Sequence, residues 1–419
     1  MKIHLNRWIY AVIAVTVLLF AGLVYAWTVL QVPISASYPE WSKGQLSLTF
    51  TLTMIGFCLG GFLGGILQKQ YSAKVIIWSA GVMFLAGFLM VSKADSLSML
   101  YLGFGILGGM ACGLVYNAVM SCVSSWFPDK QGLISGLMLM GFGISSFLVG
   151  KLYTAITPSD GSDTWRNVFF AFGIILACVM FVAGALIRRP QPDEHLEEKS
   201  EKKIDVVYEE VDAGQMIRRA SFWMYMIWAT FLSAAGLAII SQGTSVALEA
   251  CPELDMGTIA TIVGLISVSN GIGRLVFGTL FDRIGRFWSM LSGGLLFAAA
   301  MITLTAALML HSVIILTAAY IMTGLAYGCV TPVNSAFVNL YYGRKNYPVN
   351  LSVVNMNMLV ASLGSTIAGM IYDATSSYMM IIMIVIGLIA AGTLVSCFIK
   401  GQEGVQLAEG DRNRQCVSQ

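Results

Sequence analysis

The stretch "SNGIGRLVFGTLFDRIGR" (Ser269–Arg286) begins inside a long apolar segment and ends in a charged turn. Arg274 lies within the apolar part, where no acidic residue stands beside it, and Asp282 is eight positions further along the chain. If the segment is a helix, its rise of about 1.5 Å per residue places Arg274 roughly 10 Å from the polar end. An arginine at the centre of a membrane helix costs about 2.5–3.5 kcal/mol, so the residue needs an explanation if the segment spans a membrane.

The composition indicates a membrane protein. Apolar residues make up 57% of the 419 residues and charged residues 11%, with a mean hydropathy of +0.77, whereas soluble domains carry about 25% charged residues. The formal net charge of +2 indicates no class of partner, and nothing predicts nucleic-acid binding. Most of the eight cysteines stand in apolar runs without metal or redox spacing, so we expect small packing residues and no cofactor.

Apolar segments long enough to cross a bilayer, about 20 residues each, recur along the whole chain. We expect an all-α membrane protein, because no ten-residue alternating strands indicate a barrel. The first segment is too long for a signal-peptide core and is expected to be retained. Twelve spans are predicted, near residues 8–30, 44–67, 75–92, 98–123, 132–153, 166–187, 221–247, 257–281, 288–309, 313–338, 349–371 and 378–399.

Basic residues set the expected orientation, because cytoplasmic loops carry an excess of Lys and Arg. With the N-terminus inside, nineteen of the 24 basic residues are cytoplasmic and four are outside, which leaves Arg274 within a span. A polar stretch divides the spans six and six and predicts four regions. They are an N-terminal six-helix bundle (1–189), a cytoplasmic linker (190–219), a C-terminal six-helix bundle (220–400) and a cytoplasmic tail (401–419). The stretch "DAGQMIRRASFW" (212–223), where the linker meets the seventh span, resembles a short interfacial helix.

The two halves contain a degraded repeat. "GTLFDRIGR" after the eighth span aligns with "GILQKQYSAK" after the second at a shift of 213 residues. Lys69 then stands opposite Asp282, Ser72 opposite Gly285, and Gly61 opposite Arg274. The arginine therefore belongs to one half, which argues against a purely architectural role.

The quoted turn resembles the cytoplasmic signature of the major facilitator superfamily. Together with "NRWIYAVIAV", "GLVYAWTVL" and "SSWFPDKQGLISG", the Arg274 segment is similar to the oxalate/formate antiporter family, which is related to the monocarboxylate transporters. This resemblance implies two pseudo-symmetric six-helix bundles that work by alternating access. It also implies that Arg274 contacts the carboxylate of a transported anion. The alternative is that Arg274 extends to the cytoplasmic surface or pairs with Asp282.

The surroundings of Arg274 favour exchange of monoanions. No Asp or Glu stands deep within a predicted span, so an empty carrier would reorient with one uncompensated charge, which a bound carboxylate neutralises. Proton-coupled monocarboxylate transporters of animals carry an aspartate where this chain has Asn270, and oxalate exchangers of the family add a lysine in the eleventh span. Here that region offers Val354, Asn355 and Asn357. We therefore expect formate, lactate, pyruvate or a similar anion, with oxalate possible and proton symport as the alternative.

Further residues complete the predicted site. The family walls its cavity with aromatic residues, which points to Tyr25, Tyr116 and Tyr327, with ordinary packing as the alternative for each. Asn355 and Asn357 offer amide donors to the substrate, or join helices to one another, and Asn270 lies one turn from Arg274.

The charged turn is expected to act as an inner gate. Asp282 can pair with an arginine or cap a neighbouring helix in the outward-open state. Small-residue runs such as "MLMGFGISS" (138–146) allow close helix approach and carry no substrate information. The predicted gating residues are Gly278, Asp282, Arg283 and Arg286.

Other classes of function fit less well. No span carries paired histidines, an acidic cluster or a Ser/His/Asp set, so we do not expect an enzyme. The repeat argues against a channel, and a non-transporting membrane sensor stays open. The expected partners are the lipid bilayer and a small carboxylate anion, and the protein is expected to be a monomer of a bacterial inner membrane with both termini cytoplasmic.

Overall fold

The computed structural model describes residues 6–41, 43–157, 162–190, 210–375 and 377–399. Every regular element in these ranges is helical. The predicted tail and most of the predicted linker lie outside the described residues. The end of the linker is described, and its predicted short helix is α9 (Ala213–Met216), which begins with a capping box formed by Asp212 and Gln215.

Two segments of the N-terminal half contain non-α turns. The first span runs from α1 through a 3-10 segment (Gly22–Ala26) into α2, and the fourth runs from α5 through a π-helical segment (Tyr101–Gly108) into α6. The helices of this half are α1 (Arg7–Ala21), α2 (Trp27–Ser37), α3 (Lys43–Leu67), α4 (Ala73–Ser92), α5 (Leu97–Leu100), α6 (Gly109–Ser124), α7 (Gln131–Ile156) and α8 (Thr164–Leu186).

The C-terminal half contains one long helical element and two interrupted spans. After α9 come α10 (Ala220–Ser241), α11 (Gly243–Ala250), α12 (Met256–Leu310), α13 (Val313–Tyr327), α14 (Val330–Tyr342), α15 (Tyr347–Asn355), α16 (Asn357–Thr375) and α17 (Met379–Cys397).

The helices confirm the predicted multi-pass fold. Eleven helical stretches of the described chain are long and apolar enough to cross a membrane, and the longest, Thr261–Leu310, has 50 residues. It contains two predicted spans, because α12 has non-helical backbone at Gly285. Division at that residue gives the twelve spans that the sequence predicts.

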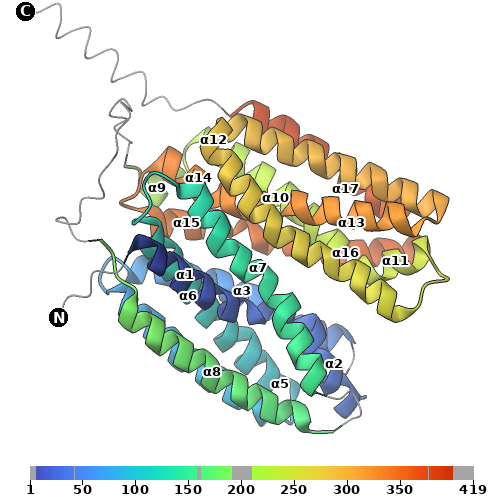
Figure 1. Ribbon diagram of the computed structural model, residues 1–419, viewed down its shortest axis with the longest axis horizontal. Coiled ribbons are helices and arrows are strands. Elements are labelled where there is room, and N and C mark those ends of the chain that lie inside the picture. The colour runs from blue at the N-terminus through green and yellow to red at the C-terminus, as the bar shows by residue number, and fades with distance from the viewer. Residues whose placement is uncertain (1–5, 42, 158–161, 191–209, 376, 400–419) are drawn as a thin grey trace, which may run out of the picture.

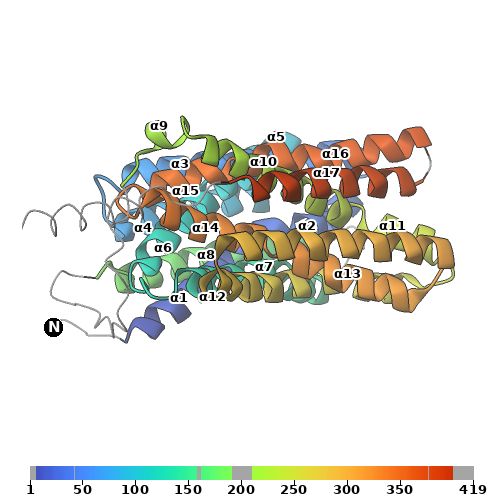
Figure 2. The same cartoon turned by 90° about the horizontal axis from the view of Figure 1, so that it is seen from above.

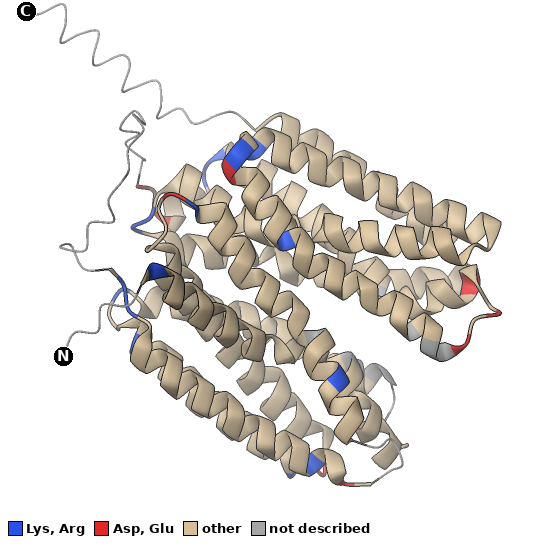
Figure 3. Ribbon diagram, viewed as in Figure 1, with Lys and Arg blue, Asp and Glu red and all other residues tan. Residues whose placement is uncertain are grey.

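The two halves form two bundles that lie side by side in Figure 1, and in the view from above in Figure 2 the C-terminal bundle partly covers the N-terminal one. In Figure 1 their helices meet at the end where α1 begins and α17 stops, and diverge toward the opposite end. We call the first the linker end, defined by Arg7, Asp282 and Cys397, and the second the far end, defined by Asp95, Asp163 and Glu249. Charged positions gather at both ends (Figure 3).

Close helix contacts reproduce the internal repeat. A Cβ atom on Gly278 of α12 would clash with the backbone of Gly132 in α7. At the equivalent position of the other half, a Cβ on Gly65 of α3 would lie 2.7 Å from the carbonyl oxygen of Pro348 in α15. In each half, the glycine that opens the "GxL" turn therefore contacts the backbone of a helix in the other half. The absence of a side chain allows this close approach.

Gly285 explains one difference between the two copies of the repeat. Its φ of 74° lies in the left-handed region, where a side chain is strained. Ser72, its counterpart, has φ −70° and ψ 153°, an extended conformation that any residue adopts. The kink in the second half therefore needs glycine, and the turn in the first half does not.

We expect Gly285→Ala to destabilise the protein by about 1–3 kcal/mol through backbone strain alone, because φ 74° and ψ −179° are adopted essentially only by glycine and no atom lies within 4 Å of the added Cβ. Thermal unfolding of the purified protein measures this cost. Ser72→Ala is the matched control and should change stability little, because its backbone conformation suits alanine. Equal stability of both variants would contradict the account of the kink.

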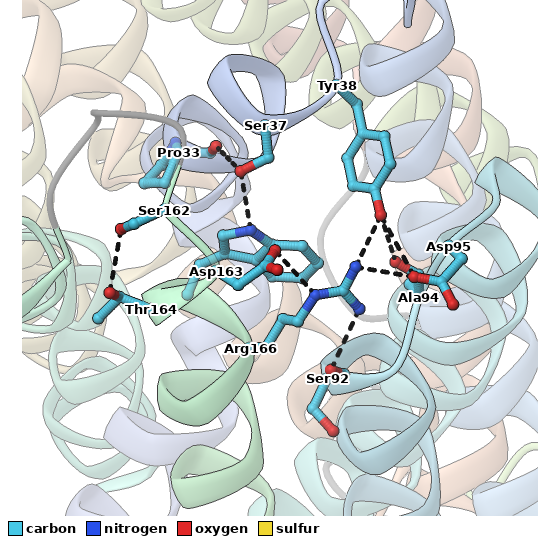
Figure 4. Close-up of polar contacts among 11 residues, drawn as sticks. Pro33, Ser37, Tyr38, Ser92, Ala94, Asp95, Ser162, Asp163, Thr164 and Arg166 are labelled. Atoms are coloured by element: carbon cyan, nitrogen blue, oxygen red, sulfur yellow. Dashed lines mark hydrogen bonds and ion pairs between the residues drawn. The ribbon is translucent and has the colours of Figure 1, made fainter.

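A polar cluster fixes the far end of the N-terminal bundle (Figure 4). The Arg166 guanidinium of α8 pairs with Asp95 at 2.8 Å and with Asp163 at 3.0 Å, and donates to the Tyr38 hydroxyl at 2.6 Å. Burial raises the pKa of Tyr38, which keeps the phenol protonated. The cluster joins the end of α2, the α4–α5 loop and the start of α8, and we interpret it as structural.

Candidate functional site

Arg274 lies where α12 packs against α7, at the contact between the two bundles. Its Nη1 donates to the carbonyl oxygen of Leu139 at 2.8 Å. A Cβ on Gly143 would lie 3.3 Å from Arg274 Cζ, so this glycine makes room for the guanidinium. The charged group therefore sits between the halves, against the backbone of the opposite bundle.

The side chain of Arg274 points away from the linker end. Its backbone carbonyl lies against Gly136, whereas its guanidinium lies against Gly143. Helix α7 runs from the linker end toward the far end, so these seven residues correspond to about 10 Å along its axis. Extension toward the nearer polar surface would require the opposite direction. The geometry therefore contradicts the alternative in which Arg274 reaches that surface.

Asn270 lies beside the guanidinium, as its spacing of four residues predicts. Its Oδ1 would lie 3.4 Å from a Cβ on Gly143, the same point that the guanidinium approaches. Asn270 is 6% exposed, and its Nδ2 is buried without a hydrogen-bond partner among the described residues. An amide donor next to the guanidinium can complete the hydrogen bonds of an oxyanion.

Two of the predicted tyrosines lie within electrostatic range of Arg274. They are Tyr116 of α6 and Tyr327 of α13, and both are at least nine-tenths buried. Tyr116 also interacts with the side chain of Asn355, while the ring of Tyr327 packs on Gly236 of α10. The structure thus gathers hydroxyl and amide groups from both bundles around one cation.

A buried polar chain continues from Asn355 and includes a residue that the sequence does not reveal. Asn334 Nδ2 donates to Asn355 Oδ1 at 3.2 Å, and the Tyr225 hydroxyl donates to Asn334 Oδ1 at 2.6 Å. The ring of Tyr225 stacks on Phe337 with centroids 3.9 Å apart. Asn334 stands out as an amide in an apolar span, but Tyr225 lies among aromatic residues that look like ordinary packing.

Two predicted site residues are not joined to Arg274 by any described contact. The side chain of Tyr25 lies outside the described residues, although its backbone belongs to the 3-10 segment of the first span. Asn357 is fully buried at the start of α16, and its amide makes no hydrogen bond with the described residues. Both remain predictions.

The predicted gate residues fall into two groups. Asp282 accepts hydrogen bonds from the backbone N–H groups of Gly132 and Leu133, each at 2.8 Å. It thereby caps α7 across the interface, where the first-turn N–H groups and the helix dipole favour a carboxylate. Arg286 instead donates to carbonyl oxygens at the end of α17, within its own half, and Arg283 is exposed.

Hydrogen bonds between the bundles extend from the linker end to the level of Arg274. Asn117 Nδ2 donates to Pro348 O at 2.7 Å, and the Ser135 and Ser335 hydroxyls lie 2.6 Å apart. Gln131 Oε1 accepts from Asn339 Nδ2 at 3.2 Å. These contacts seal the two halves together on the linker side of the guanidinium.

We expect Asp282→Ala to weaken this seal, because two hydrogen bonds to a charged acceptor are lost, each worth about 1.5–3 kcal/mol. With Cys178, Cys397 and Cys416 replaced by serine, a Ser135→Cys probe should react with a membrane-impermeant thiol reagent at least tenfold faster. Asp129→Ala is the matched control, because Asp129 pairs with Arg7 inside one bundle. Equal labelling in both variants would contradict a gating role.

Comparisons with known proteins place the chain in a large family of carriers. The sequence model of the Major Facilitator Superfamily matches residues 10–251 and 243–414. The chain is 25% identical to an uncharacterized MFS-type transporter of Escherichia coli over 85% of this chain and 86% of the relative. It is 26% identical to the oxalate:formate antiporter of Oxalobacter formigenes, with coverages of 82% and 80%, and 23% identical to monocarboxylate transporter 13 of Rattus norvegicus, with coverages of 76% and 71%.

Solved structures agree with the fold. The Escherichia coli fucose:proton symporter superposes with a TM-score of 0.69 at 14% identity, covering 95% of this chain and 100% of that structure. A proton:xylose symporter superposes with a TM-score of 0.72 at 13% identity, with coverages of 95% and 98%.

Proposed function

The chain belongs to the major facilitator superfamily, and on that premise we propose that it exchanges small monocarboxylate anions by alternating access around Arg274. The observation that carries the proposal is the position of the guanidinium between the bundles, directed toward the middle of the molecule. A planar guanidinium can bind both oxygens of a carboxylate at once. A carrier that binds its substrate between two rocking halves needs such a group at that level.

The charge of the site favours a monoanion. The acidic residues that the structure describes lie at the two ends of the bundles (Figure 3). Arg274 is the one basic residue in the part of α12 before Asp282. A dianion would bring a second negative charge into a region of low dielectric without a second cation. Formate, lactate and pyruvate are therefore better candidates than oxalate, although oxalate remains compatible with the relative from Oxalobacter formigenes.

Exchange follows from the cost of moving the empty site. Reorientation without substrate carries an arginine charge through a dry interface, whereas a bound carboxylate compensates that charge. Asn270, which does not titrate, occupies the neighbouring position, so a coupled proton would need another carrier. We infer that substrate-bound reorientation is fast in both directions and that net movement without counter-substrate is slow.

The proposed orientation has the linker end in the cytoplasm, because that end carries most of the basic residues. The sealed contacts then close the cytoplasmic side, so the structure corresponds to a state that opens outward. We further propose that the protein acts as a monomer in a bacterial inner membrane.

Uptake into proteoliposomes tests the exchange mode. Labelled formate and labelled lactate are offered to vesicles that are preloaded with unlabelled carboxylate or left empty. We expect preloading to raise the initial rate at least tenfold. Equal uptake by empty vesicles under an acid-outside gradient would instead identify proton symport, and no uptake of either anion in any condition would refute the substrate class.

A further inference from the structure

A second polar pocket lies at the linker end, between the two bundles and away from Arg274. Its volume is about 90 Å³, and its lining includes Ser121, Ser124, Arg189, Asn339, Arg344 and Tyr347. About 10–15 Å³ suffices to admit one water molecule, so the pocket has room for a molecule of several non-hydrogen atoms. The first three of these residues belong to the N-terminal half and the last three to the C-terminal half.

The mouth of the pocket is basic. Arg189 and Arg344 are both exposed, and neither forms an ion pair with a carboxylate among the described residues. Arg189 Nη2 donates to Gln68 Oε1 and to the Ser121 hydroxyl, each at 3.1 Å, while Arg344 Nη2 donates to Pro128 O at 3.3 Å. One cation thus comes from each bundle.

Two described carboxylates, Glu210 and Asp129, lie near this mouth. Glu210 accepts from the backbone N–H groups of Arg344 and Lys345 at 3.1 and 2.7 Å. Asp129 pairs with Arg7 at 2.9 Å. Arg189, Arg344 and Lys345 therefore outnumber Glu210, the carboxylate at this mouth that no described cation pairs with. This balance of charge favours an anion.

The floor of the pocket offers hydroxyl donors. Ser124 is 3% exposed, and its hydroxyl makes no hydrogen bond of standard geometry with the described residues, although it lies close to the Tyr347 hydroxyl. A buried hydroxyl without a well-aligned hydrogen-bond partner is unfavourable. A small oxyanion held by the arginines at the mouth can accept from it and remove that cost.

We propose that this pocket is a second anion site that takes a small carboxylate from the linker-side solution. A carboxylate bound there contacts Arg189 from one bundle and Arg344 from the other, so its binding stabilises the sealed state of the linker side. The proposal rests on the proposed function only for the choice of carboxylate as ligand. It requires no contact with Arg274.

Thermal unfolding of the full chain, in an Arg274→Gln background, tests the proposal. Sodium formate replaces sodium chloride at constant ionic strength, and the formate concentration at half-maximal stabilisation is measured. We expect saturable stabilisation, with the half-maximal concentration raised at least tenfold by Arg189→Gln together with Arg344→Gln. Lys345→Gln is the matched control, because Lys345 is exposed at the same loop and does not line the pocket.

A second variant separates binding from damage to the fold. Ser124→Val fills the floor and keeps both arginines, so it should also raise the half-maximal concentration at least tenfold. Equal effects of Lys345→Gln and Arg344→Gln, or saturable stabilisation by inorganic phosphate alone, would overturn the assignment. Because Arg274 is already replaced, such a failure leaves the exchange measured in vesicles unaffected.

Discussion

We expect Arg274→Gln to lower the rate of formate exchange at least about 25-fold. Breaking a desolvated charge pair costs about 2–5 kcal/mol, and each 1.4 kcal/mol corresponds to a factor of ten in affinity. Glutamine keeps an amide donor on a shorter side chain but removes the charge and the planar fork. The measurement is initial uptake of labelled formate into preloaded proteoliposomes with equal amounts of inserted protein.

Two further variants locate the cause of that loss. Arg274→Lys keeps the charge as a point cation without the fork, so its exchange rate should lie between those of the wild type and Arg274→Gln. Lys151→Gln removes another basic residue, which is exposed in α7, and should leave exchange within about twofold, because surface substitutions usually have small effects. A wild-type exchange rate in Arg274→Gln would show that Arg274 does not bind the transported carboxylate.

The second large effect is expected for Gly278→Val. A side chain at this position meets the backbone of Gly132 directly, and backbone cannot move aside as a flexible side chain can. Overpacking typically costs about 1–3 kcal/mol. Because the Gly278–Gly132 contact joins the two bundles, we expect this cost to destabilise only the state in which the linker side is sealed. Exchange should drop at least tenfold, and the Ser135→Cys probe should become accessible from the linker side.

Gly387→Val is the matched control for this prediction. Gly387 lies in α17, and a Cβ built on it has no atom within 4 Å. Valine should therefore be accommodated with unchanged exchange and unchanged probe labelling. If both glycine variants reduce exchange equally, general disturbance of the bundles accounts for the loss, and the close α7–α12 contact has no special role.

Hydropathy predicted the fold well because the spans are separated by short polar turns. It could not predict the 3-10 segment at Gly22–Ala26 or the π-helical segment at Tyr101–Gly108, since apolar residues surround these helices on all sides. The break at Gly285 was predicted as the charged turn between the spans 257–281 and 288–309. Only the left-handed backbone explains why one copy requires glycine.

The site was predictable where residues lie on one helix and unpredictable where two helices meet. Asn270 follows from its spacing to Arg274. The hydrogen bond from Arg274 to Leu139 and the contact of its guanidinium with Gly143 depend on how α7 and α12 are aligned along each other. The sequence of either helix alone does not determine that alignment. The small residues around Gly143 predicted close packing between helices. The group that packs against Gly143 is the Arg274 guanidinium.

The central claim is that Arg274 binds the transported carboxylate, and direct binding tests it most closely. Formate binding to the purified full chain is measured by calorimetry in the Arg189→Gln, Arg344→Gln background, so that only binding at the Arg274 site is counted. We predict saturable binding that Arg274→Gln weakens at least about 25-fold while the melting temperature stays within a few degrees. Unchanged formate affinity in Arg274→Gln would contradict the account.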